Sequence, residues 1–415
     1  MRIRLCLGLA VLALSLGGCG LFSKPTPTPE PASVTFVFPS AALTGHFQSL
    51  EAEFEGAHPS VDIVLRAASP YGYLTGGSRA DVLMIDQLAI AEAAQANLIR
   101  PVDPLLQEDL TLDRDAFYQG TLDALSWRGQ LWGLPADVDP WVLYFNRDLF
   151  DAAGVPYPTS SWTWDDLLQA AFMLTDFSGA TPVYGLIGDM SRADFVPLVY
   201  QNGGALVDNL VAPTTATFTD LATVEAIQWY VDLALSHGVM PTPQELDALG
   251  GFENAVVGQR GAMWYGPITE RGGTLSGRQW PFEWGVTVPP GNRERMTLLS
   301  MRAYVMSNRT EQPKASWEWI AFVANRPPSS LSVPPLKTAL ESAEFRGAYR
   351  TDVAEAALGA LEIGHTMPPT TWIEQVGGWI WQAMQRVFAG ELPLSEALAQ
   401  VQESAAPLVE RASGN

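Results

Sequence analysis

Residues 131–150 read LWGLPADVDPWVLYFNRDLF, a polar strand-like half followed by an apolar half. Because alternate side chains of a strand share a face, Asp137, Asp139 and Trp141 are predicted to lie on one side. Pro140 has no N–H to donate, so it is expected to interrupt the strand. The run 142–145 is apolar enough to be buried on both faces. The stretch therefore predicts a passage between two packed bodies, with two carboxylates and an indole at the passage.

The rest of the chain favours an α/β protein with more than one core. A length of 415 residues suggests two or three domains, and 47% apolar residues indicate a globular chain. Strand patterns at 34–38, 61–65 and 80–86 alternate with helical patterns at 47–54 and 88–97. This alternation predicts a mostly parallel sheet covered by helices.

Beyond the opening stretch the pattern becomes helical. Thr163 is placed to cap a helix, with two aspartates in its first turn. Apolar residues then recur at helical spacing in 224–235 and in 315–324, and the tail from Thr371 onward is helical and rich in tryptophan.

The N-terminus has the pattern of an export signal. Arg2 and Arg4 precede an apolar run, 5–16, that is too short to span a bilayer, so residues 1–18 are predicted to be a signal peptide.

Leu16-Gly17-Gly18-Cys19 resembles the bacterial lipoprotein box, in which the cysteine is lipidated and becomes the first residue. The prediction is a lipoprotein held on the outer side of a cell membrane by acyl chains at Cys19. The alternative is ordinary secretory cleavage with Cys19 incidental. Residues 19–32 are rich in Pro and Thr and are predicted to be an extended tether. Cys6 would leave with the signal peptide, so no disulfide is expected in the mature chain.

The charge and the motif inventory exclude several classes of function. The formal net charge is −21, and such a field repels phosphate backbones, so nucleic acid is not an expected partner. No HExxH, Cys/His cluster, GxSxG or P-loop occurs, and no cofactor or metal is predicted. A glycosidase with two carboxylates stays open. Asp137 and Asp139 are a poor catalytic pair because they approach a ligand from one side, and a calcium site there lacks further ligands.

Aromatic residues beside turns point to ligand recognition. The chain has 14 tryptophans, and several aromatic residues stand where strands or helices meet loops: Trp141, Trp264, Tyr265, Trp284 and Trp372. An aromatic face covers the apolar face of a sugar ring, and carboxylates accept hydrogen bonds from its hydroxyls. The tryptophans on helical stripes are predicted to be core residues: Trp229, Trp317, Trp319 and Trp381.

The sequence resembles the family 1 extracellular solute-binding proteins of bacterial ABC importers, which include maltodextrin-binding proteins. The resemblance covers nearly all of 33–415. It implies two α/β lobes joined by three chain crossings, with a solute bound between them. The segments that carry it are 80–86, 131–158, 161–165, 195–207, 260–268, 284–291 and 390–402.

The resemblance implies a division of the chain into lobes. Lobe 1 would hold 33–135 and 290–332, and lobe 2 would hold 139–288 and 338–415. The stretch around Pro140 would then be the first crossing.

The resemblance also implies site residues. It places a cleft-facing acid at Asp139 and an acid or amide loop at Asp86 and Gln87. It places aromatic sugar platforms near Trp264-Tyr265 and Trp372. The chain departs from the family at Ile268, where many members have an aromatic residue.

Three further residues have two readings each. Arg302 either bonds a ligand or pairs with an acid. Asp137 either accepts a ligand hydroxyl or forms a hinge cap or ion pair. Trp141 either lines the cleft or packs beneath the crossing.

These patterns predict a monomeric, lipid-anchored receptor, not an enzyme, that captures a carbohydrate and delivers it to an ABC permease. The alternatives are a non-sugar solute such as a polyol, a glycerol phosphodiester or a peptide, a lipid-anchored glycosidase, and a sensor on the same fold.

Overall fold

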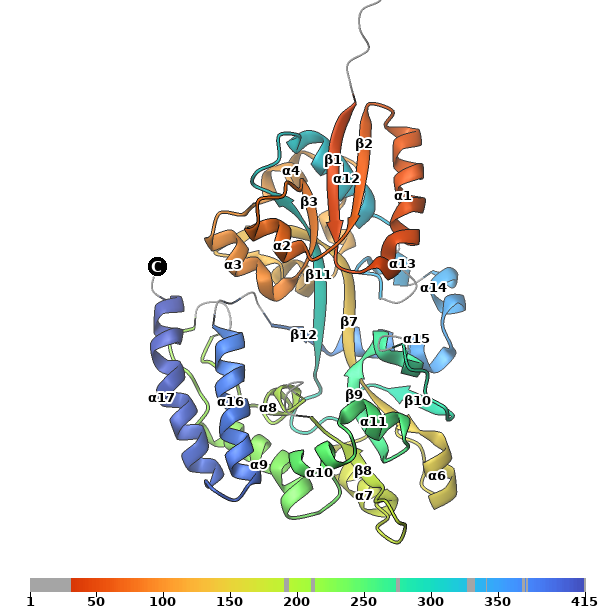
Figure 1. The fold of residues 1–415 in the computed structure, drawn as a ribbon, viewed down its shortest axis with the longest axis vertical. Helices are drawn as coiled ribbons and strands as arrows, with labels where there is room; N and C mark the ends of the chain where they lie inside the picture. The colour runs from red at the N-terminus through yellow and green to blue at the C-terminus, as the bar shows by residue number, and fades with distance from the viewer. Residues whose placement is uncertain are drawn as a thin grey trace, which may run out of the picture.

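The computed structural model describes residues 31–189, 194–209, 213–273, 277–326, 333–340, 342–367, 370 and 372–413. The predicted signal peptide, Cys19 and nearly all of the tether lie outside the described residues. Figure 1 shows two bodies, one above the other, joined by two long strands.

The upper body, lobe 1, is built on the predicted βαβ unit. β1 (Ala32–Phe38) and β2 (Val61–Ala67) pair in parallel, and α1 (Thr44–Ala57) connects them. α1 forms because Phe47, Leu50 and Phe54 share one helical face, and all three are buried. β3 (Val82–Asp86) joins the other edge of β1, also in parallel. The further elements of this lobe are α2 (Pro70–Thr75), α3 (Ile90–Gln95), β4 (Ile99–Arg100), α4 (Asp103–Glu108), α5 (Gln119–Asp123), β5 (Ser126–Trp127), β6 (Gln130–Leu131) and α12 (Pro313–Ala324).

Two strands run through both lobes. β7 (Gly133–Asn146) pairs first with β11 (Thr297–Ser307) and then with β9 (Gly261–Pro267), antiparallel in both cases. Within the described residues the sheet has the order β2-β1-β3-β11-β7-β9-β8, so the lobes share one sheet. A third connection passes at Val333, whose backbone exchanges two hydrogen bonds with Val138.

The predicted interruption at Pro140 is wrong, because β7 continues through it. Pro140 stands opposite Leu299 of β11, and pairing with β9 begins only at the next residue. Side-chain hydroxyls also bond the flanking carbonyls: Ser300 donates to Asp139 O at 3.1 Å, and Thr297 donates to Trp141 O at 2.7 Å. The missing N–H is therefore tolerated at the point where pairing passes from one lobe to the other.

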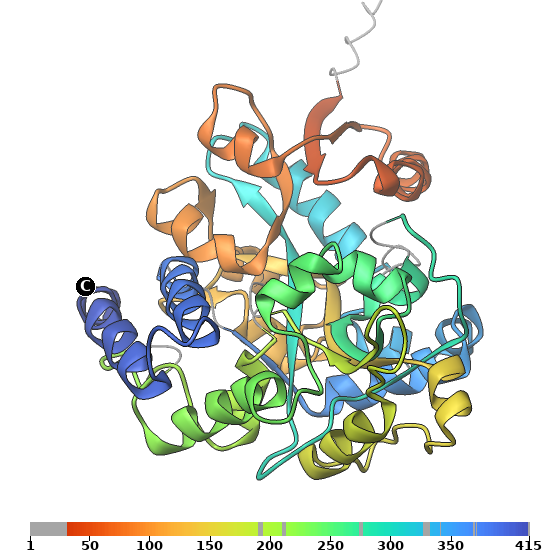
Figure 2. The same cartoon turned by 60° about the horizontal axis from the view of Figure 1, so that its bottom comes forward.

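The lower body, lobe 2, places helices on both faces of β8 (Tyr184–Ile187), β9 and β10 (Trp284–Thr287). β8 is parallel to β9, and β10 is antiparallel to β7. Figures 1 and 2 show α16 and α17 side by side at one edge of this lobe. The remaining elements are α6 (Arg147–Ala153), α7 (Trp164–Leu174), α8 (Val196–Gln201), α9 (Leu221–Leu235), α10 (Pro243–Ala248), α11 (Phe252–Val257), α13 (Lys337–Leu340), α14 (Ala343–Ala348), α15 (Thr351–Glu362), β12 (Gly364–Thr366), α16 (Ile373–Phe388) and α17 (Leu394–Ser413).

α7 shows how local sequence sets one of these elements. Thr163 accepts a hydrogen bond from Asp166 N, and the Asp166 side chain accepts one from Thr163 N, which completes a capping box. The helix then packs closely on β8, because Gly185 leaves no side chain against the backbone of Ala171. The predicted cap and helix are confirmed.

The apolar residues form three clusters that follow the lobes. One lies in lobe 1, and two lie on opposite faces of the sheet in lobe 2. The run Val142-Leu143-Tyr144-Phe145 alternates between the two lower clusters, and each residue is at most 3% exposed, as predicted for a strand buried on both faces. The exact lobe boundaries stay predictions. Among the described helices none is long and apolar enough to cross a membrane.

Candidate ligand-binding cleft

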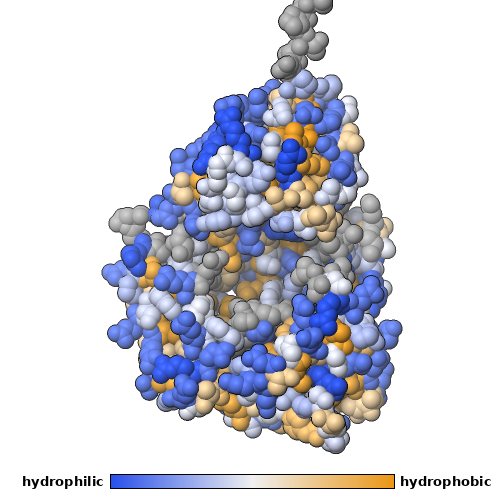
Figure 3. All heavy atoms as spheres, viewed as in Figure 1, coloured by the Kyte–Doolittle hydropathy of each residue, from blue (hydrophilic) through white to orange (hydrophobic). Residues whose placement is uncertain are grey.

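The two lobes meet at a depression. Figure 3 shows the surface hollowed between the upper and lower bodies, at the level where β7 and β11 cross. The polar residues singled out in the sequence gather at this level.

Three charged residues lie in one row across neighbouring strands. Arg302 of β11 stands opposite Asp86 of β3 on one side and opposite Asp137 of β7 on the other. Directly paired residues in a sheet point to the same face, so the three side chains share one side. Strand pairing thus unites residues that lie up to 216 positions apart in the sequence.

Arg302 and Asp137 form a partly buried ion pair. Arg302 Nε donates to Asp137 Oδ1 at 3.1 Å, and Nη2 donates to Oδ2. The Asp137 side chain is 4% exposed and that of Arg302 is 29% exposed. Of the two interpretations given for Arg302 and for Asp137, the structure therefore shows the ion pair. Because both oxygens of Asp137 are engaged and the residue is buried, it holds Arg302 and is not offered to a ligand as a hydroxyl acceptor.

Asp139 has a different environment. It is half-buried, and Thr269 donates to both of its oxygens, from N at 3.1 Å and from Oγ1 at 2.5 Å. Burial raises the pKa of Asp139 to about 6, and the charge of Asp137 adds to the rise, while the Thr269 bonds and Arg302 oppose it. Asp139 is thus a hydrogen-bond acceptor that Thr269 holds in place at the crossing. It remains partly accessible to solvent.

Asp86 and Gln87 continue this polar edge at the end of β3. Asp86 is exposed, and its Oδ1 accepts from Leu88 N at 2.9 Å, which caps η2 (Gln87–Ala89). Gln87 is 2% exposed, and its Nε2 donates to Met367 O at 3.1 Å. This bond joins lobe 1 to the segment that follows β12. Within the described residues, Gln87 Oε1 is buried and accepts no hydrogen bond.

The predicted aromatic platforms are enclosed in this structure. Trp264 is fully buried, stacked on Tyr144 and edge-on to Trp280. Tyr265 is 6% exposed and Trp372 is 2% exposed, and both pack in the cluster on the other face. The prediction that these rings present a free face is wrong for this conformation, because strand alternation turns Trp264 and Tyr265 into opposite cores.

Trp141 keeps an open side. It is half-buried and packs against the same cluster as Trp372, two residues beyond Asp139 on β7. Of the five aromatic residues singled out beside turns, Trp284 is also half-buried, but Arg350 lies over its ring. Trp141 is therefore the residue of this set with ring surface left for a ligand.

Two residues that hold the site were not predicted from the sequence. Thr269 lies 130 positions from Asp139, and Met367 lies 280 positions from Gln87. For Thr269 the signal in the sequence is the Gly-Pro turn before Ile268. No residue type near Met367 marks it as part of the site. Among the described residues, no three His, Cys, Asp or Glu side chains gather in a way that could hold a metal ion.

Two lobes, a shared sheet and a polar row at the crossing define a solute-binding fold of the periplasmic type. The profile of the bacterial extracellular solute-binding protein family matches residues 41–327, more than half of the chain. The chain belongs to this family, as the sequence resemblance predicted.

Relatives extend the match. A putative binding protein of Brucella abortus is 24% identical over 164 residues, which span 37% of this chain and 38% of that protein. The mannitol-binding protein of Pseudomonas aeruginosa is 22% identical over 99% of this chain and 98% of its own. An ABC substrate-binding protein of Listeria monocytogenes, solved with cycloalternan, superimposes with a TM-score of 0.78 at 21% identity and covers 91% of this chain and 99% of its own.

Proposed function

We propose that the protein is a carbohydrate receptor of an ABC importer, with the ligand bound between the lobes at the β7–β11 crossing. The observation that carries the proposal is Asp139, a half-buried carboxylate fixed by Thr269 at the junction of the two lobes. A fixed acceptor in a partly dry site suits a hydroxyl-rich neutral ligand.

The neighbours of Asp139 support a neutral ligand over an anionic one. Asp86 adds a second carboxylate on the lobe 1 side, and the charge of Arg302 is balanced by Asp137. A phosphate or carboxylate ligand would need uncompensated basic groups. The names of the relatives, which mention mannitol and cycloalternan, fit a polyol or sugar.

Binding between lobes gives a simple mechanism. A ligand that contacts Asp86 of lobe 1 and groups of lobe 2 together stabilises a closed arrangement over an open one. β7, β11 and the segment at Val333 are the chain connections about which the lobes would turn. In this proposal the receptor is monomeric, Cys19 carries its lipid anchor on the outer side of the membrane, and the closed form delivers the sugar to the permease.

The test is a titration of the purified protein with mono-, di- and oligosaccharides, with mannitol and with glycerol phosphate, followed by tryptophan fluorescence. We expect saturable binding of one carbohydrate class, at least tenfold weaker in Asp139→Ala because a buried hydrogen bond to a fixed carboxylate is lost (about 1.4 kcal/mol or more). Asp62→Ala, an exposed aspartate of β2, serves as control.

Two results would refute the proposal. Binding of glycerol phosphate alone would assign another solute to the fold. Sugar converted during the incubation would identify an enzyme, since a receptor returns its ligand unchanged.

A further inference from the structure

Asp137 and Asp139 are neighbouring carboxylates at the crossing that have different partners. Arg302 donates to both oxygens of Asp137, so a cation balances the charge of that carboxylate. Asp139 is held instead by the N–H and the hydroxyl of Thr269, a neutral residue. Within the described part of the chain, no lysine or arginine forms an ion pair with Asp139. The two carboxylates therefore differ in how firmly their surroundings hold the negative charge.

The place of Asp139 makes its charge sensitive to pH. The residue is half-buried at the junction of the lobes, and burial disfavours a carboxylate that has no cation beside it. Burial raises the pKa of Asp139 to about 6, so the group changes its charge between pH 5 and pH 7. An exposed aspartate stays ionised over this range.

Other titratable and charged groups surround Asp139. By element they are Asp86 of β3, Asp137 and Tyr144 of β7, Arg302 of β11, Glu270 and Arg271 of η5 (Ile268–Gly273), and His46 of α1. His46 is half-buried, and burial lowers its pKa while the charge of Asp137 opposes this. A histidine so placed can also respond to pH, so His46 needs a control of its own.

The protonation state decides what Asp139 offers to a ligand. An ionised carboxylate only accepts hydrogen bonds, whereas a protonated one donates through its O–H. A hydroxyl that donates to a carboxylate makes a charge-assisted bond, which is roughly twice as strong as a bond between neutral groups. A sugar hydroxyl that bonds Asp139 therefore binds the ionised form more tightly.

We propose that Asp139 makes sugar capture depend on pH, so that the receptor holds its ligand when Asp139 is ionised and releases it when Asp139 takes up a proton. The inference rests on the proposed function and adds a regulation of the same site. Because the sugar prefers the ionised form, binding at acidic pH expels a proton from the protein.

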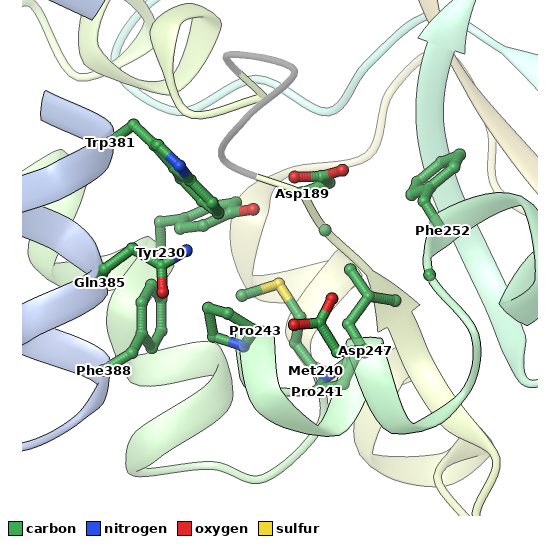
Figure 4. A pocket seen from close by; sticks show the side chains of 13 residues that line it. Asp189, Tyr230, Met240, Pro241, Pro243, Asp247, Phe252, Trp381, Gln385 and Phe388 are labelled. Carbon is green, nitrogen blue, oxygen red and sulfur yellow. The ribbon is translucent and has the colours of Figure 1, made fainter. Parts of the chain in front are cut away.

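A second pair of carboxylates provides a comparison. Figure 4 shows Asp189 and Asp247 across a cavity of lobe 2 from Trp381 and Gln385 of α16. Asp247 is exposed, so water solvates its charge, and it lies away from the junction of the lobes. Asp247→Asn is therefore the matched control for Asp139→Asn. Trp381 was predicted to be a core residue, but the structure places it in the lining of this cavity.

The experiment uses calorimetry on the purified protein with the member of the panel of sugars and mannitol that binds most tightly at pH 7.5. The parent is expected to bind it about tenfold more weakly at pH 5, because about one tenth of a group with a pKa of about 6 is ionised there. At pH 6, binding should release about half a proton, measured as a dependence of the binding enthalpy on the ionisation enthalpy of the buffer. Circular dichroism at each pH checks that the protein is folded.

The variants assign the response to one group. Asp139→Asn is expected to bind more weakly than the parent at pH 7.5, with the same affinity at every pH and without proton release. His46→Gln and Asp247→Asn should both keep the tenfold change and the proton release. Proton release is measured in the parent itself, so the test stands even where Asp139→Asn binds too weakly to be measured.

The inference and the proposed function fail in different ways. Equal affinity of the parent at pH 5 and pH 7.5, without proton release, would overturn the inference and leave the receptor standing. A pH response that disappears in His46→Gln or persists in Asp139→Asn would overturn it too, because another group would be responsible. Failure of every sugar to bind at pH 7.5 would refute the proposed function instead.

Discussion

Asp139 is expected to make the stability of the ligand-free protein depend on pH. Burial raises its pKa in the folded state to about 6 from an ordinary value of 3.8. A carboxyl group with a raised folded pKa stabilises the fold below its unfolded pKa, and this contribution is lost as the pH rises through 6. A rise of about two units corresponds to about 3 kcal/mol.

Asp139→Asn removes this titration while it keeps an oxygen that can accept from Thr269. The unfolding free energy of Asp139→Asn minus that of the parent is expected to rise by up to about 3 kcal/mol between pH 4 and pH 8. Most of this rise should be complete by pH 7. Urea denaturation followed by tryptophan fluorescence at six pH values measures the difference. Asp62→Asn, at an exposed site, should show no such growth. A difference between Asp139→Asn and the parent that stays constant over this range would refute the reasoning.

Two predictions concern stability alone. Arg302→Ala is expected to lower the free energy of unfolding by about 3 kcal/mol in the same urea assay, because it leaves Asp137 buried without its partner. Adding Asp137→Ala should restore part of the loss. Destabilisations of the two single variants that simply add in the double variant would contradict the ion pair. Gly185→Ala places a Cβ 2.2 Å from Ala171 O and is expected to lower the free energy of unfolding by about 1–3 kcal/mol. The control, Gly45→Ala, meets no atom within 4 Å and should be neutral or stabilising. Equal melting temperatures for the two variants would argue against close packing of α7 on β8.

The fold was readable from the sequence because its elements have strong local signals. The spacing of Phe47, Leu50 and Phe54 predicts α1, and the Thr163 cap predicts α7, since both depend on neighbours within one turn or two. Pro140 misled the prediction because its tolerance depends on hydroxyls of β11, about 160 positions away, and on where β9 begins to pair.

The site was readable only in part. The strand pattern singled out Asp137 and Asp139. The resemblance to the family pointed to Asp86 and Arg302, and strand register brought Asp86, Arg302 and Asp137 into one row. Composition cannot tell a platform from a core ring, so Trp264 was assigned a face that the packing covers. The burial of each ring depends on which face of the sheet a helix from a distant segment covers, and no local pattern records that.

A sugar that binds between the lobes is expected to draw them together. Small-angle X-ray scattering of the purified protein, without ligand and with a saturating sugar found by titration, tests it directly. We expect a smaller radius of gyration with sugar, and a smaller change for Asp139→Ala than for the parent at a sugar concentration near the Kd of the parent. Saturated binding that leaves the radius of gyration of the parent unchanged would refute closure of the lobes on the sugar.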